Sequence, residues 1–242
     1  MWRTLSLALA LAAAPVGAAE IGHDTFLNAE ESIPWRAVGR VNMTEPNRVR
    51  MCTGTLIRPD VVLTAAHCVV NLKTGKLRPP GTVHFLAGWH KGKWTGHSRA
   101  RAFVVHPDWD GFRQNQDPKY ATDLALIRLA KPLDVSAATP FDVVPFDSHA
   151  DDEAFILVGY RRDRAHALTY QDDCQRLKQF QSRFLLLCSA VKGASGSPIF
   201  ATTAQGPRIV AVLSAGAQGK PRAQLFTAVA YDAVHEMLGR LE

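Results

Sequence analysis

Short runs of β-favouring residues, each ended by turn residues, recur along most of this sequence. An early pair, residues 53–57 and 61–64, is separated by Arg58-Pro59-Asp60, which is a turn signal. Similar runs follow at 83–87, 102–105, 124–129, 155–159, 184–187, 198–200, 209–214 and 225–229. Many short strands at such spacing predict an all-β barrel or sandwich.

The C-terminal segment has a different periodicity. Val234, Met237, Leu238 and Leu241 recur at helical spacing, so residues 231–241 predict an amphipathic helix that packs against a barrel. Residues 130–148 contain three prolines and little periodicity, and we interpret them as the link between two halves. A length of 242 residues suffices for one large domain or two small ones.

Composition excludes several protein classes. With 47% hydrophobic and 21% charged residues, the chain is neither disordered, collagen-like nor a coiled coil. The net charge of +6 is a mild excess, and a nucleic-acid binder usually concentrates its basic residues on one face. Here the densest basic patches are short: Lys91, Lys93, Arg99 and Arg101, then Arg161, Arg162 and Arg164. We therefore expect no nucleic-acid partner.

The first nineteen residues have the pattern of a secretory signal. Arg3 is followed by an apolar run, residues 5–14, which is too short to span a bilayer. Small residues follow at Gly17, Ala18 and Ala19, where cleavage is expected. No later stretch is long and apolar enough for a membrane span, so we predict a secreted protein, extracellular or periplasmic, without stable membrane insertion.

Export gives the four cysteines a structural interpretation. An even number in an oxidising compartment predicts two disulfides, for which three pairings are possible. The pairing between sequence neighbours, Cys52 with Cys68 and Cys174 with Cys188, would close two loops. Each such bond would stabilise the fold by roughly 3 kcal/mol. Zinc is the rival interpretation, but the usual spacing of two to four residues between cysteine ligands is absent.

Three short motifs contain the residue types needed for acyl transfer. Residues 64–68 read Thr-Ala-Ala-His-Cys, residues 123–129 read Asp-Leu-Ala-Leu-Ile-Arg-Leu, and residues 193–198 read Gly-Ala-Ser-Gly-Ser-Pro. A hydroxyl needs an adjacent base to become a nucleophile, and histidine has a suitable pKa. A buried carboxylate can orient the imidazole, and a Gly-x-Ser turn can direct two backbone N–H groups at an oxyanion.

Each residue alone has an ordinary structural interpretation, as a core histidine, a strand-capping aspartate or a loop serine. The three motifs together in one exported all-β chain favour chemistry. Their order is His67, Asp123, Ser195, which is the order of chymotrypsin-type proteases; α/β-hydrolases have Ser, Asp, His. The Gly-x-Ser-x-Gly elbow of that second fold is also absent, because position 197 is Ser.

From about Ile33 to its end, the chain resembles a trypsin/chymotrypsin-like serine endopeptidase. More narrowly, it resembles the bacterial secreted branch related to glutamyl endopeptidases. The most specific stretch is residues 54–68, and the Asp123 motif is similarly close to the family pattern. Three further segments also match the family pattern: residues 33–35 (Ile-Pro-Trp), residues 213–216 (Leu-Ser-Ala-Gly) and residues 225–229 before the helix.

The resemblance implies two six-stranded antiparallel β-barrels and a C-terminal α-helix, with the active site between the barrels. The implied domains are a signal peptide (1–19), an N-terminal barrel carrying His67 and Asp123 (20–135) and a C-terminal barrel carrying Ser195 plus the helix (136–242). It also implies the Cys52–Cys68 bridge, which leaves Cys174 and Cys188 as the second pair. We expect a monomer that acts on protein or peptide substrates.

The resemblance also implies the role of each site residue. His67 is the expected general base, Asp123 orients it, and Ser195 attacks the carbonyl. Backbone N–H groups of Gly193 and Ser195 would form the oxyanion hole. No cofactor and no metal are needed for this chemistry.

Departures from the family pattern concern activation and specificity. Ala194 replaces the aspartate that pairs with a new N-terminal amine in animal members. Ser189 stands at the expected pocket floor, which argues against a preference for Arg or Lys, and Leu213 replaces the histidine of glutamyl endopeptidases. The expected substrate-binding residues are Ser189, Ser214, Ala215, Gly216 and Gln224, the last of which would narrow the pocket.

Three alternatives stay open. One is a catalytically silent homologue that acts as a binding module. A second is a metal site built from His84, His90, His97 and His106, although their spacing is not that of a zinc motif. A third is binding of an anionic surface by the basic face.

Overall fold

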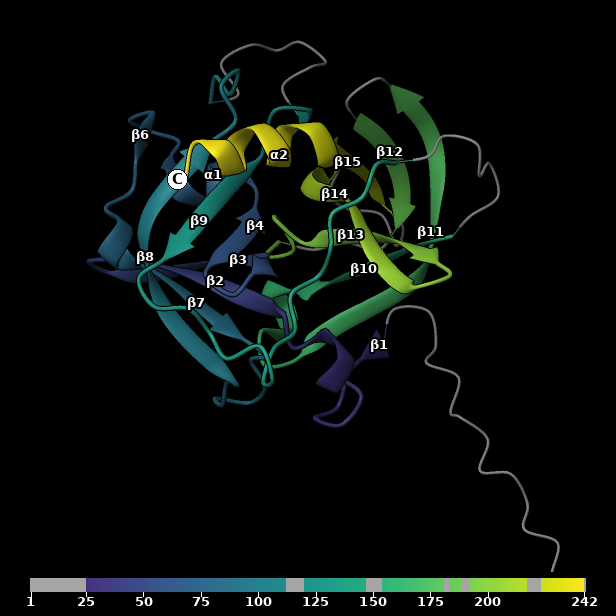
Figure 1. The fold of residues 1–242 in the computed structure, drawn as a ribbon, viewed down its shortest axis with the longest axis horizontal. Coiled ribbons are helices and arrows are strands. Elements are labelled where there is room, and N and C mark those ends of the chain that lie inside the picture. The colour runs from purple at the N-terminus through teal and green to yellow at the C-terminus, as the bar shows by residue number, and fades with distance from the viewer. Residues whose placement is uncertain are drawn as a thin grey trace, which may run out of the picture.

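The protein consists of two β-structures side by side, with the C-terminal helix on the outside (Figure 1). The computed structural model describes residues 25–111, 120–146, 154–180, 183–188, 192–216 and 223–241, and only the backbone for 223–226. The expected signal segment, residues 1–19, lies outside the described residues.

The first structure is a closed barrel of six antiparallel strands in the order β2-β3-β4-β9-β8-β7. Its strands are β2 (Val38–Glu45), β3 (Arg48–Arg58), β4 (Val61–Thr64), β7 (Val83–Ala87), β8 (Gly96–Val105) and β9 (Ala125–Leu129). All four residues of β4 are buried, as are four of the five in β9. Both faces of these two strands are therefore covered, and helix α2 (Tyr231–Gly239) contributes to the covering of β9.

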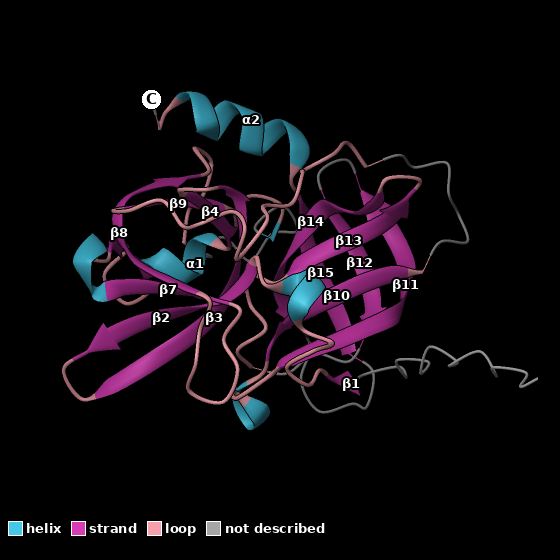
Figure 2. Ribbon diagram, turned by 60° about the horizontal axis from the view of Figure 1, so that its bottom comes forward, coloured by secondary structure: helices cyan, strands magenta, loops and turns pink. Residues whose placement is uncertain are grey.

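The second structure has the strand order β1-β11-β10-β13-β14-β15-β12, and β12 also pairs with β11. Six of its strands therefore close on themselves, and β1 adds to the outside of β11 (Figure 2). The strands are β1 (Thr25–Phe26), β10 (Phe155–Tyr160), β11 (Leu168–Phe180), β12 (Arg183–Cys188), β13 (Pro198–Thr203), β14 (Gly206–Gly216) and β15 (Ala223–Val229). The expected all-β class with two six-stranded barrels and a C-terminal helix is confirmed.

Short elements connect the strands. They are η1 (Ile33–Trp35), α1 (Ala66–Val69), β5 (Val70–Asn71), β6 (Lys76–Leu77), η2 (Pro80–Thr82) and η4 (Arg162–Arg164). Trp35 of η1 is buried and packs on Phe141, Tyr170 and Phe200, with ring centroids 5.2–5.8 Å apart. This tryptophan, part of the early Pro-Trp segment, therefore fastens the N-terminal region to the second barrel.

Each end of the described chain lies against the barrel formed by the other end. The strand β1 pairs with β11 of the second barrel, although it precedes the first barrel in sequence. The C-terminal helix α2 (Tyr231–Gly239) contacts β9 of the first barrel and buries Val234 and Met237 (Figure 1). None of the described helices has the length and apolarity that a membrane span requires.

The sequence pattern located most strands but missed two long ones. In the missed strand β2 the half-buried polar residues Arg40 and Asn42 alternate with buried Val41 and Met43, and β11 is polar over most of its thirteen residues. Both have one face that is not apolar, so they lack the hydrophobic run by which the other strands were recognised. Within the expected link, the described residues 130–146 contain no helix or strand beyond an isolated bridge of Val143 to Ile209.

Candidate active site

The pairing of β4 with β9 brings His67 and Asp123 together. Thr64 is opposite Ala125 at the end of this antiparallel ladder. The chain continues from Thr64 into helix α1, whose second residue is His67, and it enters β9 from Asp123 two residues before Ala125. Both side chains therefore leave the same end of the same strand pair, 56 residues apart in sequence.

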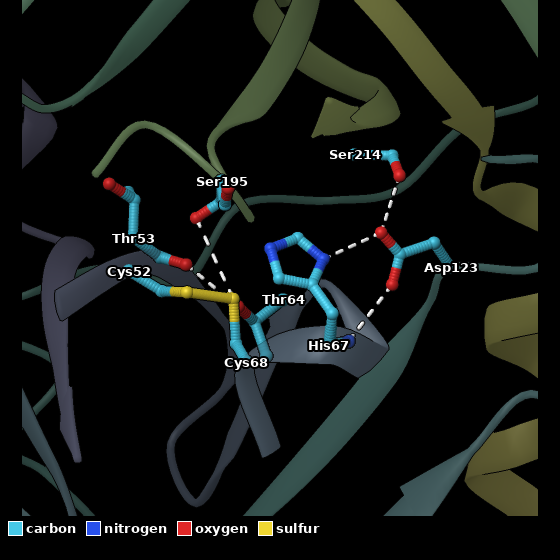
Figure 3. A network of polar contacts seen from close by, with 8 residues as sticks. All are labelled: Cys52, Thr53, Thr64, His67, Cys68, Asp123, Ser195 and Ser214. Carbon is cyan, nitrogen blue, oxygen red and sulfur yellow. Dashed lines mark hydrogen bonds and ion pairs between the residues drawn. A yellow bond between two sulfur atoms is a disulfide. The ribbon is translucent and has the colours of Figure 1, made fainter. Parts of the chain in front are cut away.

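Asp123 is completely buried and accepts three hydrogen bonds (Figure 3). His67 Nδ1 lies 2.7 Å from Oδ2, and the backbone N–H of His67 donates to Oδ1 at 3.0 Å. The hydroxyl of Ser214, from β14 of the second barrel, also donates to Oδ2. A buried carboxylate is costly unless such donors surround it, so this arrangement is consistent with an ionised Asp123.

This carboxylate fixes the tautomer of the imidazole. An ionised carboxylate only accepts hydrogen bonds, so Nδ1 carries the proton and Nε2 is left with a lone pair. In Figure 3 the ring of His67 lies between Asp123 and the segment that carries Ser195. Burial lowers the pKa of His67, but the charge of Asp123 and its hydrogen bond outweigh burial, and the net shift is above the usual 6.5.

The titration of His67 gives a direct check of this geometry. We expect the His67 imidazole to titrate above pH 6.5 in the native protein, because Asp123 stabilises the charged form. In Asp123→Asn only the lowering effect of burial remains, so the midpoint should fall. Imidazole nitrogen shifts in NMR spectra measure both values, with His67→Gln to assign the signals. An unchanged midpoint in Asp123→Asn would contradict the arrangement.

Ser195 occupies a tight turn just before β13. Ser197 N–H donates to Ala194 O at 2.9 Å, and Gly196 N–H donates to Leu213 O at 2.8 Å. Gly196 has a φ of +81°, and a Cβ there would lie 2.2 Å from Thr53 O. Glycine is therefore required next to Ser195, because this turn is pressed against β3 of the first barrel.

The backbone around this turn sets the direction of two N–H groups. Lys192 O accepts a hydrogen bond from Arg162 N at 2.6 Å, and Ala194 O accepts the bond from Ser197. In a trans peptide the C=O and N–H point in opposite directions. The N–H groups of Gly193 and Ser195 therefore point away from these internal bonds, and neither donates to a backbone carbonyl of a described residue. Gly193 has a φ of +104°, a conformation that favours glycine.

Thr53 and Thr64 connect the Ser195 turn to the first barrel, and sequence reasoning missed both. The Thr53 backbone N–H donates to Ser195 O at 2.8 Å, and its hydroxyl donates to Gly193 O at 3.3 Å. Thr64 Oγ1 donates to Thr53 O at 2.7 Å. In a strand sequence such threonines resemble ordinary β-branched residues, so the pattern gave no signal of this function.

The expected substrate-binding residues have differing outcomes. Ser214 directs its hydroxyl to Asp123, a contact the sequence did not reveal, while Ala215 and Gly216 end β14 with increasing exposure. Ser189 and the side chain of Gln224 lie outside the described residues. The backbone register nevertheless places Cys188 opposite Ala223 and Gly216 opposite Leu225, so the ends of β12, β15 and β14 are neighbours.

The cysteines are paired as expected, Cys52 with Cys68 and Cys174 with Cys188. The first disulfide joins β3 to helix α1 directly beside His67. Within the described part of the chain, Cys52, His67 and Cys68 are the one group of three potential metal ligands. The sulfur atoms of Cys52 and Cys68 are already bonded to each other in a disulfide, so this group is not a metal site. His84 Nδ1 lies 2.9 Å from His97 Nε2, and these rings stack as a surface pair.

Comparisons with known proteins identify the family. The family profile described as Trypsin matches residues 25–234. Human chymotrypsin-like elastase family member 1 is 31% identical over 134 residues, covering 54% of this chain and 44% of its own. Mouse kallikrein 1-related peptidase b24 is 35% identical over 164 residues, covering 59% and 54%. The chain thus spans about half the length of these curated relatives.

Solved structures share the fold at lower identity. A Glu endopeptidase in complex with MPD has a TM-score of 0.70 at 19% identity, covering 90% of this chain and 96% of its own. A thermostable serine protease from an extremophilic microorganism has a TM-score of 0.69 at 16% identity, covering 85% and 96%. With the profile match over most of its length, this chain belongs to the trypsin family of chymotrypsin-like serine proteases.

Proposed function

We propose that the protein is a secreted serine endopeptidase that cleaves peptide bonds through an acyl-enzyme on Ser195. The observation that carries this proposal is the buried Asp123, which holds His67 Nδ1 at 2.7 Å on the side of the ring away from Ser195. A histidine with its lone pair on Nε2 is the base that a serine hydroxyl requires.

Each proposed step uses a group described above. The Ser195 hydroxyl loses its proton to His67 Nε2 while its oxygen bonds to the carbonyl carbon. The N–H groups of Gly193 and Ser195 stabilise the resulting oxyanion. The C–N bond then breaks as His67 returns the proton to the leaving amine. Water attacks the acyl-enzyme in the same way, with His67 as base, and releases the carboxylic acid and free Ser195.

Substrate preference is the finer part of the proposal. The ends of β12, β14 and β15 would form the pocket, with Ser189, Ser214, Ala215, Gly216 and Gln224 as its residues. Ser189 offers no charge to a basic side chain, and Leu213, which is buried, replaces the histidine expected of a glutamyl endopeptidase. We infer that the pocket does not select Arg, Lys or Glu at the cleavage site. We also propose that the protein is a member of the bacterial secreted branch of the family.

Export is supported by the chemistry of the cysteines. Two disulfides persist in oxidising compartments, and the cytosol keeps thiols reduced. We propose removal of residues 1–19 as a signal peptide and a monomer of two domains, 20–135 and 136–242. The domain 20–135 would contribute His67 and Asp123, and the domain 136–242 would contribute Ser195. The active site would therefore require both domains.

Labelling with a fluorophosphonate probe tests the activity and separates it from the silent-homologue alternative. An activated Ser195 should react with the probe at neutral pH, and peptide mapping should find the adduct on Ser195 alone. Prior heat denaturation should abolish labelling, because the reaction depends on the folded site. A peptide library with mapped cleavage sites would then define the preferred residue. Absence of both labelling and cleavage would favour a binding module.

A further inference from the structure

An open surface cavity of about 500 Å³ lies between the β2–β3 hairpin of the first barrel and the β5–β6 hairpin, outside the site described above. One wall is the turn between β2 and β3, which contributes Glu45, Arg48 and Arg50. The opposite wall is the β5–β6 hairpin and the segment after it, which contribute Lys73 and Arg78. The cavity therefore has four cationic side chains and one carboxylate, a net charge of +3 if all are ionised.

The single carboxylate shows what kind of group this cavity accepts. Glu45 lies 2.6 Å from Arg48 Nε, 2.9 Å from Arg78 Nη1 and 3.2 Å from Arg50 Nε. Hydrogen bonds from Arg48 and Arg78 lower the pKa of Glu45 to about 2. Three guanidinium groups thus converge on one carboxylate, and their remaining positive charge, with that of Lys73, is not balanced within the cavity.

Buried donors without acceptors also line this cavity. The side chain of Arg78 is only 9% exposed, and its Nε is buried without a hydrogen-bond partner in the described ranges of the chain. Arg50 Nε is buried too, and its contact with Glu45 lacks hydrogen-bond geometry. These two Nε atoms are enclosed, but a guanidinium has further N–H donors, and the side chains of Arg48 and Arg50 are 56% and 41% exposed, so an incoming oxyanion could meet their remaining N–H groups.

The cavity is within reach of a polypeptide that occupies the active site. Arg50 is three residues, and Arg48 five residues, before Thr53, which bonds to Ser195 O. Along β3 this corresponds to about 10 to 17 Å at 3.3 Å per residue. The opposite wall begins at Asn71, two residues after the end of helix α1 with His67, and Arg78 N–H donates to Val69 O at 2.9 Å.

The rim favours a polypeptide over a uniformly charged polymer. Leu72 and Leu77 line the cavity and are 47% and 53% exposed, and two prolines also contribute. A ligand with alternating acidic and apolar side chains would cover these leucines and meet the arginines. From this combination we propose that the cavity is an accessory site that binds an acidic, partly apolar segment of the polypeptide substrate, outside the residues next to the cleaved bond.

Binding of a peptide to the cavity is measured first. This binding does not depend on catalysis, so its result is independent of the proposed function. The protein carries Ser195→Ala, and the probe is the fluorescein-labelled peptide Glu-Leu-Asp-Leu-Glu, compared with its Gln/Asn counterpart by fluorescence anisotropy. Arg48→Glu with Lys73→Glu should raise the Kd of the acidic peptide by about tenfold or more, because charge-assisted contacts are lost. The charge-matched control, Arg101→Glu with Lys131→Glu, changes exposed residues outside the cavity and should leave the Kd unchanged.

Several results would overturn the inference. If the Gln/Asn peptide bound with the same Kd as the acidic peptide, the carboxylates would have no role in binding. If both double variants raised the Kd of the acidic peptide by the same factor, the effect would come from net charge and not from the cavity. Inorganic phosphate at constant ionic strength should compete with the peptide for the cavity. Binding of phosphate without binding of the peptide would show a small-anion site and refute the polypeptide ligand.

Cleavage then tests the connection with the proposed function. Paired substrates carry Glu or Gln at positions three to five residues from the cleaved bond, on either side. We expect the Glu substrate to have the higher kcat/KM on one side, and Arg48→Glu with Lys73→Glu to remove that advantage without changing the Gln substrate. If the peptide bound but the Glu substrate had no higher kcat/KM than the Gln substrate, the cavity would not recruit substrate. If no substrate were cleaved at all, the proposed function would be refuted, but the binding result would still hold.

Discussion

Replacing Ser195 with alanine should lower kcat/KM on the order of 10⁶-fold and leave the fold intact. The hydroxyl is the only proposed nucleophile, and its loss leaves just binding and the oxyanion hole to accelerate attack by water. The turn itself is held by backbone bonds of Ser197, Gly196 and Thr53, none of which involves the Ser195 side chain. Steady-state kinetics together with thermal denaturation would therefore separate loss of chemistry from loss of structure.

Ser197 provides a matched control two residues away. It is fully buried, and its Oγ has no hydrogen-bond partner among the residues that the structure describes. Removing an unsatisfied buried hydroxyl is expected to be neutral or slightly stabilising, so Ser197→Ala should keep its activity. If Ser195→Ala stayed active while Ser197→Ala lost activity, the nucleophile would be Ser197. Loss of activity in both without unfolding would point to the turn and not to one hydroxyl.

The sequence predicted an all-β class because most strands carry a continuous apolar run, and the division into two barrels was implied by the resemblance to the protease family. The strand β4 is an example, because Val61, Val62 and Leu63 are all buried and are followed directly by the helix with His67. The strand β11 was missed because it is polar over most of its length and is held by pairing with β10, β12 and β1. Its formation depends on partners that are distant in sequence, which a local pattern does not contain.

The candidate site shows the same difference between local and distant information. Motif order indicated His67, Asp123 and Ser195, and the geometry places the first two in contact. The contacts of Ser214 with Asp123 and of Thr53 with the Ser195 turn join the two barrels across 91 and 142 positions of the chain. Serine and threonine in strands are common, so only the folded structure distinguishes these two from their neighbours.

The carboxylate of Asp123 is the second group whose alteration should have a large effect. Asp123→Asn should lower kcat on the order of 10⁴-fold at neutral pH while the fold persists. Asp123 accepts bonds on both oxygens, from His67 Nδ1 and Ser214 on Oδ2 and from His67 N–H on Oδ1. An asparagine has one acceptor oxygen, so its NH₂ group must face at least one donor in either orientation.

Both orientations of that asparagine impair the base. If its NH₂ faces Nδ1, the imidazole must leave Nδ1 unprotonated, and the proton on Nε2 prevents acceptance of the Ser195 proton. If its NH₂ faces the backbone N–H of His67, two donors oppose each other in a buried site, which costs about 1–3 kcal/mol. In either case the charge that raises the pKa of His67 is gone, so the imidazolium formed during attack is destabilised.

The measurement is a pH profile of kcat/KM for the native protein, Asp123→Asn and the control Asp142→Asn. Native activity should fall as the pH drops through the raised pKa of His67, because the protonated ring is not a base. Asp142 is 73% exposed and pairs with Arg208 at 3.3 Å, so its change removes the same charge far from the imidazole and should preserve both the rate and the midpoint. In Asp123→Asn the rate should collapse and the midpoint should move to lower pH. A variant with full activity and an unshifted profile would show that His67 acts without this carboxylate, and the proposed triad would be wrong.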